Sequence, residues 1–329
     1  MSLSLKKPRR RRLSRRHFVA LSCVGTAGIS GTSWLASSNT FAARFVRDRL
    51  AERKQLVAVP KFKPDPQKWD TQSVTAAWLG HSTVLLNIFG VTVLTDPVLF
   101  RRVGADVGIG TVGPKRLIAP ALALEELPPI DLVLLSHAHF DHWDMPTLRH
   151  FGPETQAVVA RATFDLLKGM KFGSARELAW GDKSVLRTRH GEVQIEAFEV
   201  RHWGARMRSD TYRGYNGYVI SRGDRRIIFG GDTAITSAFA DLKSRGPFDL
   251  ACMPIGAYNP WAMSHCNPEE AVSMANEAGA RYILPIHHQT FKLSREPALE
   301  PIERLQTALQ KEPERLAWRN VGETFVLKT

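Results

Sequence analysis

The sequence predicts an α/β fold in which two β-sheets pack face to face and helices cover their outer sides. Three observations lead to this prediction. From residue 73 onward, short apolar runs alternate with strong turn signals, as strands require, and stretches of helical character lie between them. The chain has 329 residues, of which 43% are hydrophobic, enough for one large core. We see no internal repeat, so residues 73–329 are expected to form a single domain.

The expected strands are short, and tight turns join several of them. Residues 131–136 form a continuous apolar run, which is typical of a strand buried on both faces. Residues 193–200 instead alternate between apolar and polar side chains. Gly90 and the segment 221–224 are expected to turn two hairpins. Further strands are expected at residues 74–79, 83–89, 91–95, 215–220 and 226–229.

Helical stretches are expected between these strands. The clearest start belongs to the stretch 268–278, because Asn267 is a good N-cap and Pro268 then occupies the first helical position, where its missing amide hydrogen is no loss. The other helices are expected at residues 162–171, 237–244 and 301–309.

The first 42 residues have the features of an export segment. A basic stretch precedes a mildly apolar run at residues 18–36, and short side chains follow. Residues 14–19 resemble the twin-arginine export signature, whose pathway carries folded proteins and therefore suits a chain that binds metal before export. We expect a periplasmic protein. The alternative is a retained membrane anchor, because the apolar run approaches the length that spans a bilayer.

Residues 43–72 are expected to connect this segment to the domain. The stretch 44–57 is basic and weakly amphipathic at helical spacing, which predicts either peripheral membrane contact or a solvated helix packed on the domain. Eight of the 45 Lys and Arg residues fall in the first 42 positions, so the formal charge of +13 drops to about +5 without them. No groove motif of aromatic and basic residues is evident, and no nucleic-acid partner is expected. The sequence does not specify an oligomeric state.

Metal-capable side chains gather where the apolar run 131–136 ends. His137, His139, Asp141 and His142 fall within six residues, and such groups left unpaired in the interior would be costly. His137 and His139 alternate and can face the same way, while the following turn can aim the other two at a neighbouring point, so two metal centres can share one loop. Imidazole and carboxylate without thiolate suit Zn²⁺ best, with Fe or Mn also compatible. The alternative is a polar surface loop.

Three more metal-capable residues also follow expected strands. His202 comes after the stretch 193–200, Asp232 follows an apolar stretch that ends in two glycines, and His287 follows residues 282–286. A sheet can therefore gather all seven residues on one rim, which weakens the surface-loop interpretation.

These motifs resemble those of a known family. His137, His139, Asp141 and His142, followed by His202, Asp232 and His287, are similar to the successive ligand motifs of the metallo-β-lactamase superfamily, and the similarity spans roughly residues 74–327. The branch of N-acyl phosphatidylethanolamine phospholipase D and its ascorbate-lactonase-like relatives is resembled more narrowly by segments 78–82, 95–97, 230–233, 254–258 and 265–271, and by residues 286–287 with 290–291. The resemblance implies an αββα sandwich of two mixed β-sheets and a zinc-dependent hydrolase.

The resemblance also implies a role for each residue. Two zinc ions per chain are expected, one held by His137, His139 and His202. The other would be held by Asp141, His142 and His287, with Asp232 bridging both. Metals about 3.5–4 Å apart lower the pKa of a shared water and supply hydroxide as the nucleophile. Asp141 is also a candidate to orient that hydroxide or to accept its proton.

Three other histidines have weaker expectations. His265 matches a substrate-side histidine of the phospholipase branch, so a general acid for the leaving group or a phosphate contact is expected, the alternative being a histidine hydrogen-bonded within its loop. His81 either braces a ligand or is a satisfied core residue. His288 should point away from His287. The residues after His287 depart from the aromatic residue and glycine that the branch tends to carry, which affects the local pocket.

Three functions compete at this point. The first is a phosphodiesterase acting on a phospholipid-like substrate, with Trp203, Trp261 and Phe291 either walling an acyl-chain pocket or packing normally. The second is a lactonase or other carboxylic-ester hydrolase that uses the same metals on a small-molecule ester. The third is a non-catalytic, metal-binding envelope protein, which has little use for a bridging acid. Several arginines around His202 either grip an anionic substrate or form a solvated loop: Arg201, Arg206, Arg208 and Arg213.

Overall fold

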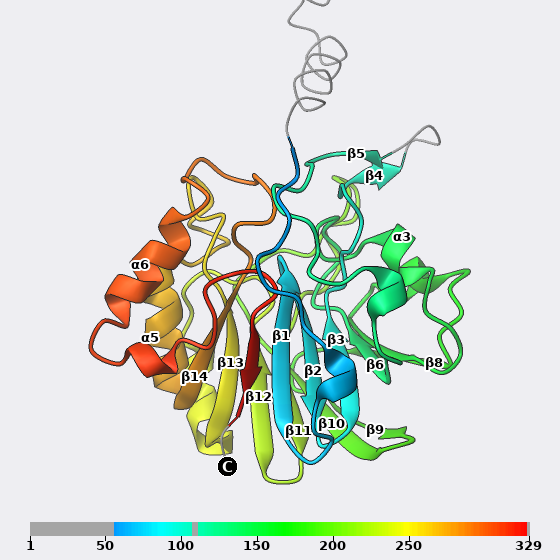
Figure 1. Ribbon diagram of the computed structural model, residues 1–329. Helices are drawn as coiled ribbons and strands as arrows, with labels where there is room; N and C mark the ends of the chain where they lie inside the picture. The colour runs from blue at the N-terminus through cyan, green and yellow to red at the C-terminus, as the bar shows by residue number, and fades with distance from the viewer. Residues whose placement is uncertain (1–55, 107–110, 328–329) are drawn as a thin grey trace, which may run out of the picture. The chain divides into compact units, whose positions relative to one another are not determined.

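The computed structural model describes residues 56–106 and 111–327. Val57 to Leu327 belong to one compact unit, which contains both large β-sheets (Figure 1). The predicted export segment 1–42 and most of the basic stretch 44–57 lie outside the described residues. Segment 57–72 contacts the rest of this unit, since the Ala58 amide donates to Leu117 O at 2.9 Å.

The first sheet is mixed and has seven strands. Its first three strands in the chain form an antiparallel meander, whereas β3, β6, β7 and β8 run parallel. The last strand of the chain pairs with β1 and forms one edge of this sheet. In spatial order the strands are β15 (Thr324–Val326), β1 (Val74–Gly80), β2 (Thr83–Ile88), β3 (Val91–Thr95), β6 (Leu132–Leu134), β7 (Gln156–Ala160) and β8 (Ser174–Leu178).

The second sheet is also mixed and has six strands. Strands β9 to β12 pair antiparallel, and β12, β13 and β14 run parallel. In spatial order they are β14 (Ala280–Ile286), β13 (Phe248–Pro254), β12 (Arg225–Phe229), β11 (Gly217–Arg222), β10 (Gly191–Phe198) and β9 (Lys183–Thr188). A small separate ribbon pairs β4 (Ala105–Asp106) with β5 (Thr111–Val112). The two mixed sheets confirm the predicted fold class.

Successive side chains of β12 pack into two different hydrophobic cores, one on each face of the second sheet. Ile227 and Phe229 belong to the core that also contains residues of the first sheet, whereas Ile228 faces a second core. The second core also contains Phe239, Met274 and Leu305, which come from the helices. Because successive side chains of a strand point to opposite faces, a continuous apolar run is required where both faces are covered.

Helix α5 (Pro268–Ala278) covers the outer side of β13 and β14, and α6 (Glu300–Ala308) packs against α5 (Figure 1). The predicted start of α5 is confirmed, because the Asn267 side chain accepts from the Glu270 amide at 2.9 Å and Glu270 reciprocates. Two further α-helices are single turns, α3 (Met145–Leu148) near the first sheet and α4 (Ala238–Asp241).

The helix predicted at residues 162–171 is wrong. Only a 3-10 turn, Phe164–Leu167, is present. Ala162 has a left-handed backbone with φ 58°, and Gly169 has φ 82°, so neither end can continue a right-handed helix. The stretch 237–244 is also divided, since α4 passes directly into the 3-10 helix Leu242–Arg245. Across the part of the chain that the structure describes, no helix combines the length and hydropathy of a transmembrane span.

Leu85 tests the packing of the two sheets. It lies in β2, is 0% exposed and belongs to the core shared by the sheets. We expect Leu85→Ala to lower the free energy of unfolding by about 2–5 kcal/mol, because the truncation leaves a cavity. The matched control is Leu299→Ala at a position that is 56% exposed, where a change within about 0.5 kcal/mol is expected. Urea unfolding measures both, and equal effects would contradict the core assignment.

Candidate metal centre

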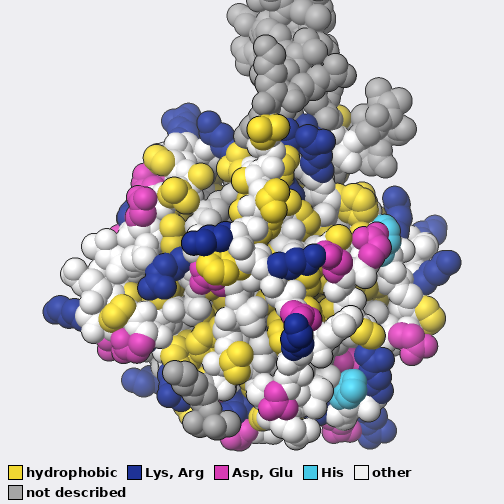
Figure 2. All heavy atoms as spheres, viewed as in Figure 1, with side chains coloured by type: hydrophobic (Ala, Val, Ile, Leu, Met, Phe, Trp, Pro, Cys, Tyr) yellow, Lys and Arg dark blue, Asp and Glu magenta, His cyan; other side chains and the backbone are white. Residues whose placement is uncertain are grey.

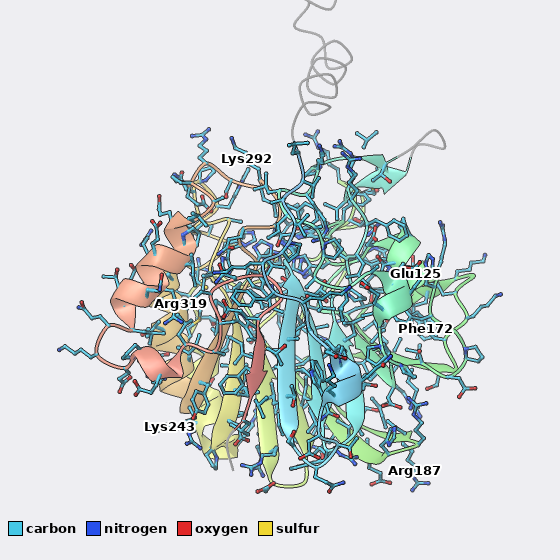
Figure 3. The ribbon with its side chains drawn as sticks, viewed as in Figure 1. Glu125, Phe172, Arg187, Lys243, Lys292 and Arg319 are labelled. Atoms are coloured by element: carbon cyan, nitrogen blue, oxygen red, sulfur yellow. The ribbon has the colours of Figure 1, made fainter. Side chains whose placement is uncertain are left out.

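The predicted site residues come together at the end of the sheets that bears the long loops. His137 follows β6 of the first sheet, and His202, Asp232 and His287 follow β10, β12 and β14 of the second. Figure 3 marks this end by Lys292, in the loop after β14, and the opposite end by Arg187 of β9. Strands of both sheets therefore aim their ends at one place, as the sequence suggested.

Three imidazoles form the first group of ligand atoms. His137 Nε2 lies 2.8 Å from His139 Nδ1, which in turn lies 3.2 Å from His202 Nε2. With an oxygen of Asp232, these three nitrogens fit within 4.8 Å of one another. Three imidazole nitrogens and one carboxylate oxygen make four donors, the number that a tetrahedral zinc site takes.

Two imidazoles and a carboxylate form the second group. Asp141 Oδ2 lies 3.7 Å from His142 Nε2 and 3.5 Å from His287 Nε2. The same oxygen lies 3.0 Å from His81 Nε2, and these four residues form a second cluster that is able to hold a metal ion. His81 thus contacts a site carboxylate, which agrees with the bracing role considered above.

Asp232 lies between the two groups. Its Oδ2 is 3.1 Å from both His142 Nε2 and His287 Nε2, 3.8 Å from His202 Nε2 and 4.0 Å from His137 Nε2. Its other oxygen has no hydrogen-bond partner among the described residues, and neither do the two nitrogens that lie closest to Oδ2. Buried polar atoms without partners are unfavourable. Bound cations would satisfy them, so the residues present fit a metal centre.

The pKa values of the first group favour metal binding. Burial, followed by the charge of neighbouring imidazoles, lowers the pKa of His137 well below its usual value. Burial likewise lowers the pKa of His202 well below normal and that of His139 to about 4. These rings are therefore neutral near pH 7, and each keeps a nitrogen lone pair free for a cation.

The second group has the opposite electrostatics. Burial would lower the pKa of His287, yet the carboxylates of Asp232 and Asp141 raise it to about 9. The same two carboxylates raise the pKa of His142 well above normal. Both acids, although buried, have pKa values well below normal because imidazoles surround them. Without a metal, protonated His142 and His287 would supply the positive charge that a bound cation would otherwise provide.

A hydrogen-bond chain orients the ligands from behind. Asp96 Oδ2 lies 2.7 Å from His142 Nδ1 and accepts from Ser136 Oγ at 2.6 Å, and that hydroxyl lies 2.8 Å from His137 Nδ1. His202 Nδ1 lies 2.9 Å from Ser264 O. Such partners fix the orientation of metal ligands. Sequence reasoning assigned no role to Asp96 or Ser136. One signal could have identified Asp96: it directly follows the strand predicted at residues 91–95, just as the metal-capable residues follow their strands.

Left-handed backbone conformations concentrate at this site. Asp96, His81 and His287 have φ values of 32°, 54° and 61°, and non-glycine residues adopt this region at some energetic cost. Gly231, just before Asp232, has φ 57°, and a Cβ there would lie 2.8 Å from the Cβ of Ser136. A larger residue at this position would therefore force a shift of this backbone or of Ser136, which lies behind His137.

His265 and His288 occupy different surroundings. His265 Nδ1 lies 3.7 Å from Asp232 Oδ2 without a hydrogen-bond partner, and its ring stacks on His287 at 5.2 Å. Burial lowers the pKa of His265 to about 4, so this ring is neutral at pH 7. The ring of His288 stacks on Trp78, and among the described residues His288 belongs to none of the groups that could hold a metal ion.

A cavity of about 200 Å³ adjoins the cluster, and Trp203, Trp261, Ser264 and Leu293 contribute to its wall. The two tryptophans are 52% and 55% exposed, so they present apolar surface rather than filling a core.

Two of the four arginines near His202 are already engaged. Arg206 donates to the carbonyl oxygens of Ala138 and Trp143, and Arg213 pairs with Asp165 and Asp210. These two side chains therefore support loops.

Residues 92–288 match the model of the family described as the beta-lactamase superfamily domain. The chain belongs to the beta-lactamase superfamily. The superfamily match covers every residue of the metal-capable cluster except His81, which precedes it.

Relatives in this superfamily share a substantial part of the chain. An uncharacterized protein of Mycobacterium tuberculosis is 35% identical over 80% of this chain and 72% of its own. The N-acyl-phosphatidylethanolamine-hydrolyzing phospholipase D 1 of Caenorhabditis elegans is 34% identical over 70% of this chain and 68% of its own. A metal-dependent hydrolase of Bacillus cereus is 28% identical over 70% of this chain and 93% of its own. Together with the His and Asp clusters, this similarity places the chain among the metal-dependent hydrolases of the superfamily.

Solved structures agree on the fold. The metallo hydrolase Igni18 of Ignicoccus hospitalis is similar with a TM-score of 0.57 and 18% identity, covering 78% of this chain and 99% of that one. The isothiocyanate hydrolase from Delia radicum gut bacteria gives a TM-score of 0.59 at 17% identity, and the match covers 76% of this chain and 98% of that one. The fold is therefore that of the metallo-β-lactamases.

Metal binding should stabilise the folded protein. We expect chelator-stripped protein to gain roughly 5–10 °C in Tm when a divalent metal is added at about a hundred times its Kd, because the metal binds only the folded site. Thermal unfolding with Zn²⁺, Mn²⁺ and Fe²⁺ added separately measures the gain. A His150→Ala variant, altered at an exposed histidine away from the cluster, should show the full gain. No gain with any of these ions would contradict the metal centre.

Asp96 should control metal affinity without binding the metal itself. We expect Asp96→Asn to weaken Zn²⁺ binding about 10–100-fold, because a neutral amide holds the His142 ring less strongly than the carboxylate and does not increase its basicity. Competition with a chromophoric chelator measures the affinity. Asp131→Asn is the matched control. Asp131 is also a buried carboxylate, but it accepts from the Thr92 amide, which lies at the end of β3 opposite to Asp96. Equal effects in the two variants would show that loss of a buried charge alone is responsible.

Proposed function

We propose that this protein is a binuclear zinc-dependent phosphodiesterase acting on a phospholipid-like substrate. The observation that carries the proposal is the position of Asp232, whose buried carboxylate lies within 4.0 Å of imidazoles from both ligand groups. The similarity to a phospholipase D that hydrolyses N-acyl-phosphatidylethanolamine supports the choice of bond.

The ligand assignment in this proposal follows the two groups. His137, His139 and His202 would hold one zinc, Asp141, His142 and His287 the other, and Asp232 would be shared. When bound, a pair of zinc ions activates water as the nucleophile and polarises the phosphoryl oxygen. No serine or cysteine nucleophile is then required.

Asp141 and His265 would act on protons and on substrate oxygens. Asp141 is held by His81 at 3.0 Å, which orients its carboxylate to accept a proton from the attacking water. His265 also lines the cavity beside the cluster. Its pKa of about 4 makes a neutral ring, which is a poor proton donor but a good hydrogen-bond donor. We therefore favour a contact to a phosphate oxygen over general-acid catalysis for His265.

Apolar surface near the site supports an amphiphilic substrate. Trp203 and Trp261 are about half exposed at the cavity beside the cluster. Figure 2 shows exposed hydrophobic side chains, interspersed with Lys and Arg, toward the loop-bearing end of the molecule. Such a surface suits peripheral contact with a membrane that carries anionic lipid. The export expected from residues 1–42 would bring the protein to such a membrane.

A carboxylic-ester hydrolase, such as a lactonase, is the second candidate. The cavity beside the cluster measures only about 200 Å³, a size that suits a compact cyclic ester as well as a phosphodiester. Zinc held by the same ligands would polarise a carbonyl oxygen in place of a phosphoryl oxygen.

The proposal predicts two zinc equivalents in the purified protein and hydrolysis of bis(p-nitrophenyl) phosphate. We expect Asp232→Ala to lower this activity by more than about a hundredfold, because the shared ligand is lost. Elemental analysis and p-nitrophenol release measure the two quantities. Asp131→Asn, a buried carboxylate outside the site, should retain activity within about twofold.

The alternatives give different results in the same experiment. Protein with two metals that hydrolyses a lactone but not the diester would favour the ester hydrolase. Protein that fails to bind metal after anaerobic and zinc-supplemented preparation would overturn both candidates.

A further inference from the structure

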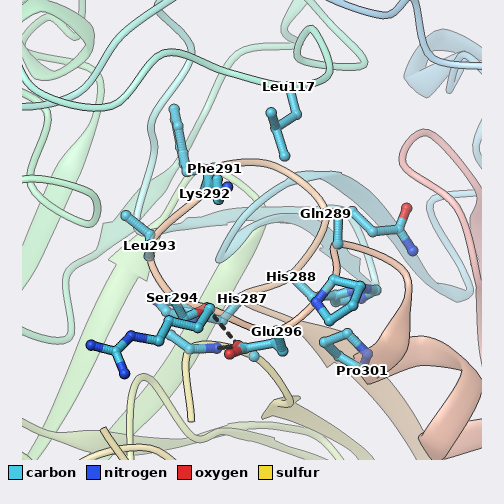
Figure 4. Close-up of a pocket in the computed structure, with 15 residues that line it drawn as sticks. Leu117, His287, His288, Gln289, Phe291, Lys292, Leu293, Ser294, Glu296 and Pro301 are labelled. Carbon is cyan, nitrogen blue, oxygen red and sulfur yellow. Dashed lines mark hydrogen bonds between the residues drawn. The ribbon is translucent and has the colours of Figure 1, made fainter. Parts of the chain in front are cut away.

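Two cavities adjoin each other at the loop-bearing end of the molecule. The second, of about 330 Å³, shares Ala257, His287 and Leu293 with the wall of the cavity at the metal centre. Figure 4 shows Leu117 and Pro301 on opposite sides of this second cavity. The protein surface around the two cavities therefore lies on the path of any molecule that reaches the metal centre.

Large apolar side chains are exposed on the loops around these cavities. Trp203 and Trp261 line the cavity at the metal centre, and each is about half exposed. Met263 follows two positions after Trp261 and is 72% exposed. We call these three side chains the apolar patch. Exposed apolar side chains that gather at one place mark an interaction surface.

Hydrogen bonds fix the loops of the apolar patch to each other and to the metal centre. His202 Nδ1 lies 2.9 Å from Ser264 O, which joins the loop after β10 to the loop after β13. The Arg295 amide donates to Asn259 O at 2.9 Å, which joins the wall of the second cavity to the loop that precedes Trp261. The patch is therefore held in place beside the metal ligands.

The exposed charges of these loops are positive. Segments 201–213, 255–265 and 291–299 contain two acids, Asp210 and Glu296, and both are buried. The exposed basic side chains of the same segments are Arg201, Arg208, Lys292 and Arg295. A partner with a negatively charged surface is therefore favoured over a cationic one.

The described chain also enters the domain beside these cavities. The Ala58 amide donates to Leu117 O at 2.9 Å, and Leu117 lines the second cavity. The next residue, Val59, is 85% exposed. Figure 1 shows the first described residues at the loop-bearing end. An anchor retained in residues 1–42, the alternative to a removed export segment, would therefore be attached to the domain at this end.

We infer that the apolar patch docks on the surface of a bilayer that contains anionic lipid, with both cavities facing the bilayer. Tryptophan rings favour the interface between lipid and water, and basic side chains near that interface attract anionic head groups. A second copy of the chain is disfavoured as the partner, because two surfaces of the same positive charge repel each other. The inference rests on the proposed function for its consequence, that a phospholipid-like substrate enters the cavities directly from the bilayer.

Binding of the full chain to lipid vesicles tests the docking surface. We expect tighter binding to vesicles of equal parts phosphatidylglycerol and phosphatidylcholine than to phosphatidylcholine alone. Met263→Asp should weaken binding to the mixed vesicles about tenfold or more, because it removes an apolar contact and adds a repelled charge. Cosedimentation with the vesicles measures the affinities.

Val185→Asp is the matched control for this charge change. Val185 is 52% exposed in β9, at the opposite end of the molecule, so the variant should change binding by less than about twofold. Equal effects of the two variants, or equal binding to the two kinds of vesicle, would overturn the inference.

Fluorescence quenching identifies the docked face whether or not an anchor also binds the vesicles. We expect brominated phosphatidylglycerol to quench the fluorescence that is lost in Trp261→Phe. It should not quench the fluorescence that is lost in Trp69→Phe, because Trp69 precedes β1, whose other end reaches the metal centre at His81. Vesicle-bound protein in which Trp261 is not quenched would overturn the inference.

The outcomes for the docking surface and for the proposed function are distinguishable. Zinc-loaded protein that docks through the apolar patch but hydrolyses no phospholipid would support the docking surface and contradict the phosphodiesterase. Protein that hydrolyses the soluble diester but binds neither kind of vesicle would overturn the docking surface alone. A dimer in solution that Met263→Asp dissociates, without vesicle binding, would assign the patch to a second copy of the chain and also overturn the inference.

Discussion

One buried carboxylate, that of Asp232, sets the requirements for the rest of the site. An ionised acid that is 2% exposed is stable only when positive charge or hydrogen-bond donors surround it. Here the imidazoles of His142 and His287 lie 3.1 Å away, and both have raised pKa values because of this acid and Asp141. Whether protons or metals occupy the centre, the arrangement depends on positive charge at this point.

Holding these groups together places demands on the backbone. The loops that follow several strands bring their side chains to the same rim of the sheets. Asp96, His81 and His287, which lie in these loops, have left-handed backbone conformations. Such conformations cost of order 1–3 kcal/mol each and persist only where the surrounding structure enforces them. Strands such as β12, buried on both faces, supply that rigidity. The two sheets therefore form the core of the protein and also fix the positions of the residues of its metal centre.

The sequence predicted most of this arrangement, for reasons that can be identified. Strand periodicity and the N-cap of α5 are local signals, and the structure agrees with them. The error at residues 162–171 arose because apolar spacing does not report the left-handed backbone of Ala162. The contact between Asp96 and His142 joins residues 46 positions apart and requires the pairing of β3 with β6 to be known.

The division of the ligands between the two sheets has a consequence for assembly. The first sheet contributes His137, His139, Asp141 and His142, and the second contributes His202, Asp232 and His287. Neither sheet carries a complete set of donors for either centre, because Asp232 and one further histidine always come from the second. A chain whose halves have each folded but have not docked cannot form the complete site. Metal content consequently reports whether the two halves of the protein have joined correctly, independently of any catalytic assay.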